Sequence, residues 1–273
     1  MEKLEKSVRD REISGVLKLW SAGGSLSKRV VESLADDGAL QWADSLSAHG
    51  LQGARAAAAV LAKAAAEPDA IGSRLRALSI HPDRTVRQGA AQALGRQLTA
   101  RFSDLLPVVE GWVADPEPGV RRAAVQATSV AASTGNIGWS GALLNTLAPL
   151  LSDRSPHVGR ALGPGALART YLEVFPDDTV EHLAQWSTSH DERVLWNVAM
   201  AFSGPAAGKV AGKAVIVLGR LALDDRPYVR AAVAAALRAL TDHAPPVAVP
   251  KLRSWLSDEE RAPVARAALR HTR

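Results

Sequence analysis

Apolar and small residues recur along the chain in a pattern that repeats about every 35 residues. Most copies have an acidic or proline-containing turn, then a valine, a basic residue and several alanines, as in 115–125 and 225–233. The valine, which is an alanine in the first copy, anchors the pattern at intervals of 32 to 38 residues: Ala54, Val86, Val120, Val158, Val194, Val229 and Val264. A period in this range with two helical segments per unit predicts an all-α fold, an α-solenoid.

Each unit is expected to hold an amphipathic first helix, as in 103–113, and an alanine-rich second helix that begins near the anchor, as in 229–240. Proline or aspartate ends the first helix, and the alanines allow neighbouring helices to approach closely. We expect residues 1–48 to form one or two less regular N-terminal capping helices and residues 49–273 to form the repeats. Because no linker interrupts the pattern, the sequence predicts a single domain over 1–273.

Composition excludes several kinds of chemistry. The chain has no cysteine, which rules out disulfides, thiolate zinc sites and cysteine nucleophiles. It has no phosphate-binding glycine loop and no serine-nucleophile motif, and its seven histidines are scattered, so we expect no metal and no cofactor. The charged start is unlike a secretory signal and no stretch is apolar enough to span a bilayer, which predicts a cytoplasmic protein without a membrane partner.

Comparison of the copies shows which positions serve the core. The position eight residues before the anchor holds leucine in most copies, so Trp112 and Trp186, which stand there, are expected to pack in the core. The position after the anchor holds Arg55, Arg87, Arg121 and Arg230. These arginines form either a ladder of Arg–Asp pairs between neighbouring units or a basic ridge on the inner surface. We favour the ladder.

Two adjacent central copies depart from this pattern together. Gly159 and Leu195 replace the arginine, while Trp196 stands in a polar or small column and Asn197 in a column of glycine and alanine. The segment 163–165, Gly-Pro-Gly, is expected to kink or open its helix. Such departures mark either function or strain, or a drift of the repeat.

Trp139 fits no column. It lies in a glycine-rich loop, where it either staples the loop to the next helix or serves as a stacking platform.

The Asp–turn–Val–Arg–Ala form resembles HEAT repeats, an armadillo-type fold, from about residue 40 to the end. Segment 112–125 further resembles the Trp…Arg-Arg-Ala-Ala part of the bacterial HEAT-like alkylpurine DNA glycosylases, and 151–163 with 171–177 resembles their next unit. The resemblance implies an arginine-lined concave face that binds duplex DNA, with a carboxylate and tryptophans around a damaged nucleotide. Arg121 or Arg122 matches the family's arginine pair, and Arg122 matches better. Where the family has Trp-Asp-x-x-Asp, this chain has 81–87, which is basic near Arg87, and Pro164 replaces an expected tryptophan.

Charge supports the same interpretation, since the net charge is +5 and arginines outnumber acids between residues 120 and 170. We therefore expect a HEAT-like protein that binds duplex DNA in alkylation-damage recognition or repair, with or without glycosylase activity. The alternative is a scaffold that holds a protein or peptide in the same groove. The DNA-binding candidates are Arg87, Arg121, Arg122, Arg160, Trp139, Trp196 and Asn197, and if the protein is an enzyme the candidate carboxylates are Asp83, Asp191 and Glu192.

Overall fold

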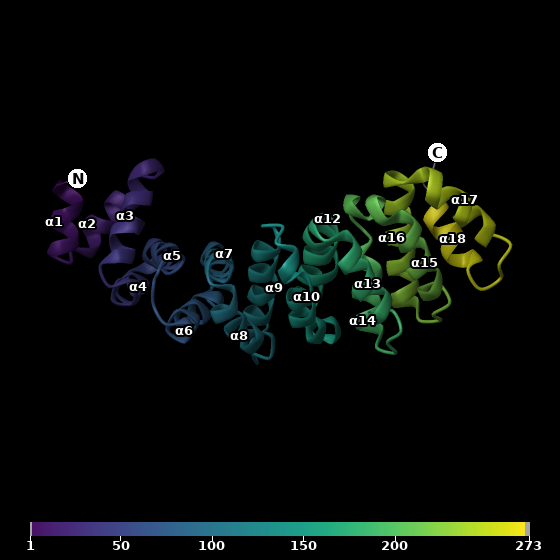
Figure 1. Ribbon diagram of the computed structural model, residues 1–273, viewed down its shortest axis with the longest axis horizontal. Coiled ribbons are helices and arrows are strands. Elements are labelled where there is room, and N and C mark those ends of the chain that lie inside the picture. The colour runs from purple at the N-terminus through teal and green to yellow at the C-terminus, as the bar shows by residue number, and fades with distance from the viewer. Residues whose placement is uncertain (1, 271–273) are drawn as a thin grey trace. The chain divides into compact units, whose positions relative to one another are not determined.

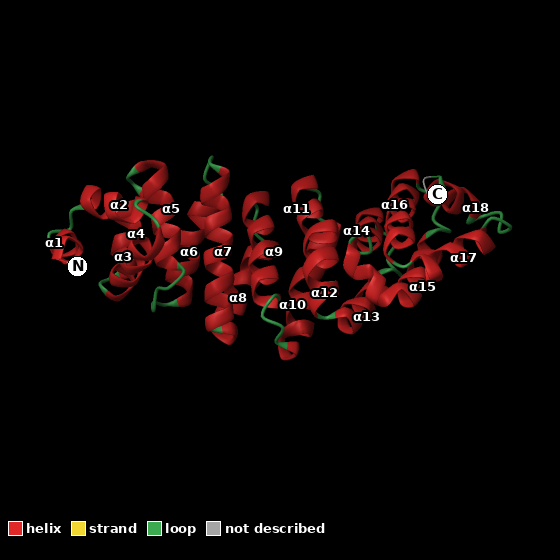
Figure 2. Ribbon diagram, turned by 90° about the horizontal axis from the view of Figure 1, so that it is seen from above, coloured by secondary structure: helices red, strands yellow, loops and turns green. Residues whose placement is uncertain are grey.

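A computed structural model describes residues 2–270 of the chain, and within this range it contains helices and loops but no strand (Figures 1 and 2). Two compact units divide the chain, Met1–Ala131 and Ala132–Arg273. The prediction that 1–273 is a single domain remains a prediction. No helix of the described part is long and apolar enough to cross a membrane.

Unit 1 is built from helical hairpins in which consecutive helices pack side by side. Its helices are α1 (Glu2–Arg9), α2 (Ile13–Ser21), α3 (Gly24–Asp36), α4 (Ala39–Ser47), α5 (Gly50–Leu61), α6 (Pro68–Ser79), α7 (Arg84–Ala100), α8 (Phe102–Val113) and α9 (Pro118–Ala132). The first helices α4, α6 and α8 pack on one another in order, and so do the second helices α5 and α7. The stretch 1–48 thus holds α1 to α4 rather than the one or two helices expected, and α4 pairs with α5 as a regular hairpin.

Unit 2 continues the same arrangement with less regular helices. It contains η1 (Ile137–Trp139), α10 (Ser140–Leu147), η2 (Ala148–Ser152), α11 (Pro156–Ala161), η3 (Leu162–Tyr171), α12 (Leu172–Val174), α13 (Pro176–Trp186), α14 (Glu192–Ala201), η4 (Pro205–Val210), α15 (Ala211–Leu221), α16 (Pro227–His243), α17 (Pro245–Trp255) and α18 (Ala262–Leu269). The first helices α10, α13, α15 and α17 form one layer, and η3, α14, α16 and α18 form the other. These two layers confirm the predicted α-solenoid.

The anchor column forms the core of each hairpin. Ala54, Val86, Val120, Val158, Val229 and Val264 are all buried, whereas Val194 is only partly buried. Trp112 is buried as predicted. Trp186 is half-buried and contacts His182 edge-on, with ring centroids 5.5 Å apart, so the core prediction holds only in part for this residue.

The Gly-Pro-Gly segment opens its helix as predicted, because η3 is a π-helix of ten residues that follows directly on α11. Pro164 has no N–H to donate to the Arg160 carbonyl four residues earlier, which removes one α-helical hydrogen bond. At the far end of η3 the Leu172 N–H donates to the carbonyl of Leu167, five residues earlier, which is the π-helical spacing. π-Helical turns within α-helices occur frequently at functional sites.

Candidate functional site

The arginines after the anchor hold the turns of their own hairpins. Arg87 Nη1 donates to the carbonyls of His81 and Pro82 at 2.7 and 2.6 Å. Arg230 Nε donates to the carbonyl of Asp224 at 2.6 Å, six residues earlier. The Arg–Asp ladder that we favoured is therefore wrong for Arg87 and Arg230, whose partners are backbone carbonyls of the preceding turn. Turn carbonyls lack helical donors, so a guanidinium at this position satisfies them.

Arg121 follows the same rule, since its Nη1 donates to the carbonyls of Asp115 and Pro116 at 2.8 and 3.0 Å. Other columns also supply ion pairs between repeats, such as Arg76 with Asp115 at 2.6 Å. Arg87, Arg121 and Arg230 thus have a structural task in their own hairpins, and the arginine column does not by itself define a binding face.

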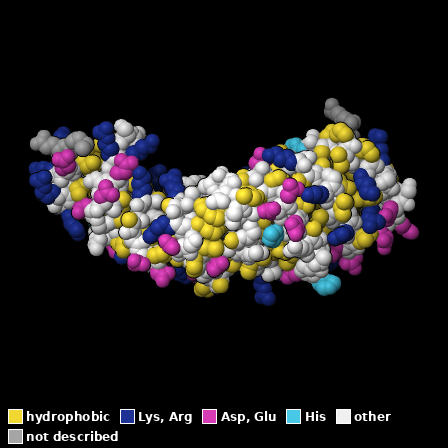
Figure 3. Space-filling view, viewed as in Figure 1, with side chains coloured by type: hydrophobic (Ala, Val, Ile, Leu, Met, Phe, Trp, Pro, Cys, Tyr) yellow, Lys and Arg dark blue, Asp and Glu magenta, His cyan; other side chains and the backbone are white. Residues whose placement is uncertain are grey.

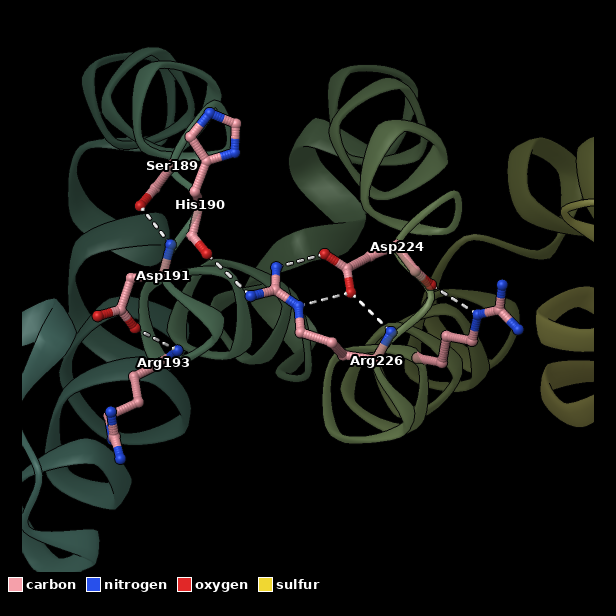
Figure 4. Close-up of polar contacts among 7 residues, drawn as sticks. Ser189, His190, Asp191, Arg193, Asp224 and Arg226 are labelled. Atoms are coloured by element: carbon pink, nitrogen blue, oxygen red, sulfur yellow. Dashed lines mark hydrogen bonds and ion pairs between the residues drawn. The ribbon is translucent and has the colours of Figure 1, made fainter.

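One polar junction joins two successive turns of unit 2 (Figure 4). Arg226 makes a two-armed ion pair with Asp224 and donates from Nη1 to the carbonyl of His190 at 2.8 Å. The Arg226 guanidinium holds the pKa of Asp224 below its usual value. This junction fixes the start of α16 relative to the start of α14.

Two of the three candidate carboxylates cap helices. Asp83 Oδ1 accepts from the N–H groups of Thr85 and Val86 at the start of α7, at 2.7 and 3.3 Å. The hydroxyl and N–H of Thr85 lower the pKa of Asp83. Asp191 accepts from the N–H of Arg193 at 2.7 Å and caps α14. Carboxylates held in this way stabilise helix starts, and their bound lone pairs make them weak general bases.

Arg122 stands one residue after the arginine column and differs from the arginines in it. It is half-buried on α9, and its guanidinium has no hydrogen bond or ion pair to any of residues 2–270. Burial lowers the pKa of Arg122, and the positive charges of Arg87 and Arg84 on α7 lower it further. We call Arg84, Arg87 and Arg122 the unit 1 arginine cluster. Three neighbouring guanidiniums, one of them half-buried and lacking a carboxylate, form an arrangement that an anion would stabilise.

The distribution of basic side chains on the surface does not by itself single out the unit 1 arginine cluster. On the side of the molecule that Figure 3 shows, basic side chains occur over both units and gather over α1 to α3. An unpaired, half-buried guanidinium is a more selective signal than surface charge, because a desolvated cation costs free energy unless a partner arrives.

Unit 2 contains a cavity of about 490 Å³ that brings several of the predicted residues together. Trp196 and Tyr228 lie in its wall with their rings stacked, 5.8 Å between centroids and 9° between planes. The other lining residues come from the turn before α11, from α11 itself and from the start of α14: Asp153, Arg154, Ser155, Pro156, Gly159, Arg160, Glu192, Arg193 and Asn197. We call this space the Trp196 cavity. It contains three predicted DNA-binding residues and the third candidate carboxylate, Glu192.

Asn197 has a structural task within this wall. Its side chain is 2% exposed, Oδ1 accepts from the N–H of Gly163 at 3.1 Å, and Nδ2 donates to the carbonyls of Leu151 and Arg193 at 2.9 and 3.0 Å. A DNA contact by this amide would require some of these bonds to break. Asn197 instead fixes the start of the π-helix to α14.

The departures of the two central repeats are paired in space. A Cβ on Gly163 would stand 2.8 Å from Asn197 Oδ1 and 3.0 Å from its carbonyl oxygen. A Cβ on Gly159 would stand 3.7 Å from Trp196 Cζ3. Each glycine of one repeat therefore faces the unusual side chain of the next.

Trp139 lies outside the Trp196 cavity. It is half-buried at the end of η1 and precedes the first residue of α10, while the adjacent Ile137 is 64% exposed. The staple and platform interpretations of Trp139 both stay predictions.

Sequence comparison between copies missed Tyr228, Arg193 and Arg84, whereas Arg154 was counted only in the basic excess between residues 120 and 170. Tyr228 and Arg193 both stand directly before the anchor, in a column that also contains threonine, glycine, histidine and proline. A column this variable carries no signal until the neighbouring helix is seen. Among the described residues there is also no group of acids and histidines that could hold a metal ion.

No protein-family model matches the chain, and no curated protein matches it. Solved structures do. AlkD2 from Streptococcus mutans is 18% identical, with a TM-score of 0.53, over 75% of this chain and 98% of that one. The chain is an α-solenoid of the HEAT and armadillo type. AlkD2 is of the glycosylase family that segments 112–125 and 151–163 resemble, and at this identity the likeness shows the fold.

Two transport factors share the same architecture. The structure of Kap95p with RanGDP contains a chain that is 12% identical, with a TM-score of 0.52, and importin beta is 15% identical, with a TM-score of 0.50. This chain is covered to 98% and 94%, but it spans only 41% and 38% of theirs. The fold is thus shared with AlkD2, Kap95p and importin beta.

Proposed function

We propose that the protein binds the phosphate backbone of duplex DNA through the unit 1 arginine cluster, in the recognition of alkylated DNA. The observation that carries the proposal is Arg122, a half-buried guanidinium without an anionic partner among residues 2–270 and beside Arg84 and Arg87. A phosphate diester supplies the missing negative charge and accepts hydrogen bonds from guanidinium groups.

The likeness of fold to AlkD2 supports the same choice of ligand over a carboxylate-bearing partner. Catalysis has weaker support, because Asp83 and Asp191 accept hydrogen bonds from their own helix starts. Glu192 is the candidate without such a task. We therefore propose a DNA-binding role first, and an excision assay with Glu192→Gln tests for a catalytic carboxylate.

The experiment is fluorescence anisotropy of the full chain with a labelled duplex, at about 50 mM and about 200 mM salt. Arg122→Ala should weaken binding about tenfold. It should also reduce the slope of the logarithm of the binding constant against the logarithm of the salt concentration by about one, because one phosphate contact is lost. Arg220→Ala is the matched control, since Arg220 is an exposed arginine on α15 and its loss removes the same charge. A duplex with an abasic-site analogue tests damage preference.

Two results would contradict the proposal. One is no binding of duplex at low salt, where a basic surface binds most tightly. The other is an Arg122→Ala variant that binds like the unmodified protein while Arg220→Ala does not.

A protein scaffold is the second candidate, because the fold is shared with Kap95p and importin beta. The unit 1 arginine cluster would then take carboxylates of an acidic partner. Binding of polyglutamate with the same sensitivity to Arg122→Ala, and no binding of duplex, would favour this function.

A further inference from the structure

The Trp196 cavity combines an aromatic surface with a cationic rim. Trp196 and Tyr228 are stacked almost parallel, and Tyr228 is 49% exposed. Parallel stacked rings at this separation form a flat apolar face on which a further planar group can stack. Large aromatic side chains that stay exposed in a wall of a cavity are costly to leave in contact with water.

Three guanidiniums around this face lack a carboxylate. Arg154, Arg160 and Arg193 line the cavity, and none of them forms an ion pair within residues 2–270. The Arg160 guanidinium lies 3.2 Å from the Nδ1 of His157. Two acids, Asp153 and Glu192, also line the cavity, so the cations exceed the acids by one.

We propose that the Trp196 cavity binds a nucleoside phosphate, with the base stacked on the Trp196–Tyr228 pair and the phosphate held by Arg154, Arg160 and Arg193. The cavity volume of about 490 Å³ has room for one such group. An acidic peptide would pair with the guanidiniums but would leave the aromatic face without a planar partner. A neutral aromatic ligand would stack on the aromatic face but would leave the guanidiniums without an anion.

The shape of the cavity depends on Gly159. Other copies of the repeat carry arginine at this position, as at Arg87 and Arg230. A side chain here would extend from a Cβ only 3.7 Å from Trp196 and would occupy the space in front of the ring. The missing side chain thus opens the cavity. This inference goes beyond duplex binding, because it needs residues of unit 2 alone.

The test is titration calorimetry of the full chain with deoxyadenosine monophosphate, deoxyadenosine and inorganic phosphate, in the absence of duplex. The monophosphate should bind once per chain with a dissociation constant below about 1 mM. Deoxyadenosine and phosphate should each bind at least about tenfold more weakly, because each lacks one half of the recognition. A short oligodeoxyadenylate separates the two sources of the ligand: tighter binding than the monophosphate indicates a single strand, and equal binding a free nucleotide.

Variants with matched controls test the stacking surface and the guanidinium groups separately. Tyr228→Ala should weaken monophosphate binding at least about fivefold by loss of stacking, while Tyr228→Phe keeps the ring and the affinity. Arg193→Ala should weaken it about tenfold, and Arg220→Ala, an exposed arginine on α15, should leave it unchanged. Gly159→Leu should abolish binding without removing any contact, and since leucine stands at the equivalent Leu195, the helix accepts it.

Four results overturn the proposal. The first is no binding of the monophosphate at millimolar concentration. The second is phosphate binding as tightly as the monophosphate, which would leave a simple anion site. The third is polyglutamate binding in place of the monophosphate, which would indicate an acidic protein partner. The fourth is unchanged affinity in Gly159→Leu when its circular dichroism matches the unmodified protein.

Discussion

Asn197→Ala is a decisive test of the pairing between Asn197 and Gly163, because the repeat consensus and the structure predict opposite signs for the change in stability. The equivalent positions in other copies are Ala123, Ala161 and Ala232, so restoring the repeat consensus would be expected to stabilise the protein. The structure predicts a loss. Without the amide, the N–H of Gly163 and the carbonyl of Leu151 lose their buried partner.

The magnitude follows from these two groups. A buried polar group left without a partner costs about 1–3 kcal/mol, so two cost about 2–6 kcal/mol. The bond to the Arg193 carbonyl adds little, since that carbonyl lies within α14 and has a helical donor. Alanine gains about 0.6 kcal/mol of helix propensity over asparagine. The free energy of unfolding should therefore fall by about 1–5 kcal/mol.

Urea unfolding followed by circular dichroism measures the total, and amide hydrogen exchange at Gly163 measures the local effect. Exchange matters because a repeat array can unfold in more than one step. The Gly163 amide should lose protection in the variant more than amides of α7 in unit 1. A variant as stable as the unmodified protein, or more stable, would refute the hydrogen-bond argument and favour the consensus.

Two further predictions concern stability. Gly163→Ala should destabilise the protein by about 1–3 kcal/mol, because its Cβ would stand 3.0 Å from the fixed carbonyl oxygen of Asn197. The control Gly111→Ala has open space at its Cβ and should be neutral or slightly stabilising. The urea midpoints of the two variants check this prediction. Asp224 has a pKa below its ordinary value of 3.8 because of Arg226, so the stability that it contributes is present above that value and is lost as the pH falls through the folded-state pKa. Asp224→Asn should lower stability at neutral pH, and urea midpoints between about pH 6 and about pH 2 should show the difference shrinking with acid; a constant difference would contradict the ion-pair explanation.

The repeat made most of the fold predictable from the sequence. Hydrophobic anchors such as Val86 and Val229 are buried in six of the seven copies, so their spacing alone reveals the period and the layers. Pro164 likewise predicted an opened helix, because a missing N–H acts locally. These features depend on the residues of one repeat at a time.

The site depends on pairs of repeats, and this is why its geometry could not be predicted. Column comparison singled out Trp196 and Asn197 but could not tell that one lines a cavity and the other is buried with its amide fully bonded. It could not tell whether Arg87 faces a carboxylate or a carbonyl, since the turn before α7 holds both the Asp83 carboxylate and the carbonyls of His81 and Pro82. It passed over Tyr228, whose column has no consensus and whose ring acquires its importance only from Trp196.

The two paired departures have different physical causes and one consequence. At Gly163 the absence of a side chain allows α14 to approach the π-helix so closely that Asn197 can bond to its backbone. At Gly159 the absence of the usual arginine leaves space in front of Trp196. The first departure fixes the position of α14 and with it the ring, and the second opens the cavity beside that ring. Drift of a repeat would remove contacts at unrelated positions, whereas here each loss on one helix is matched by a gain on the next. The match indicates that the cavity is a feature built by both repeats together.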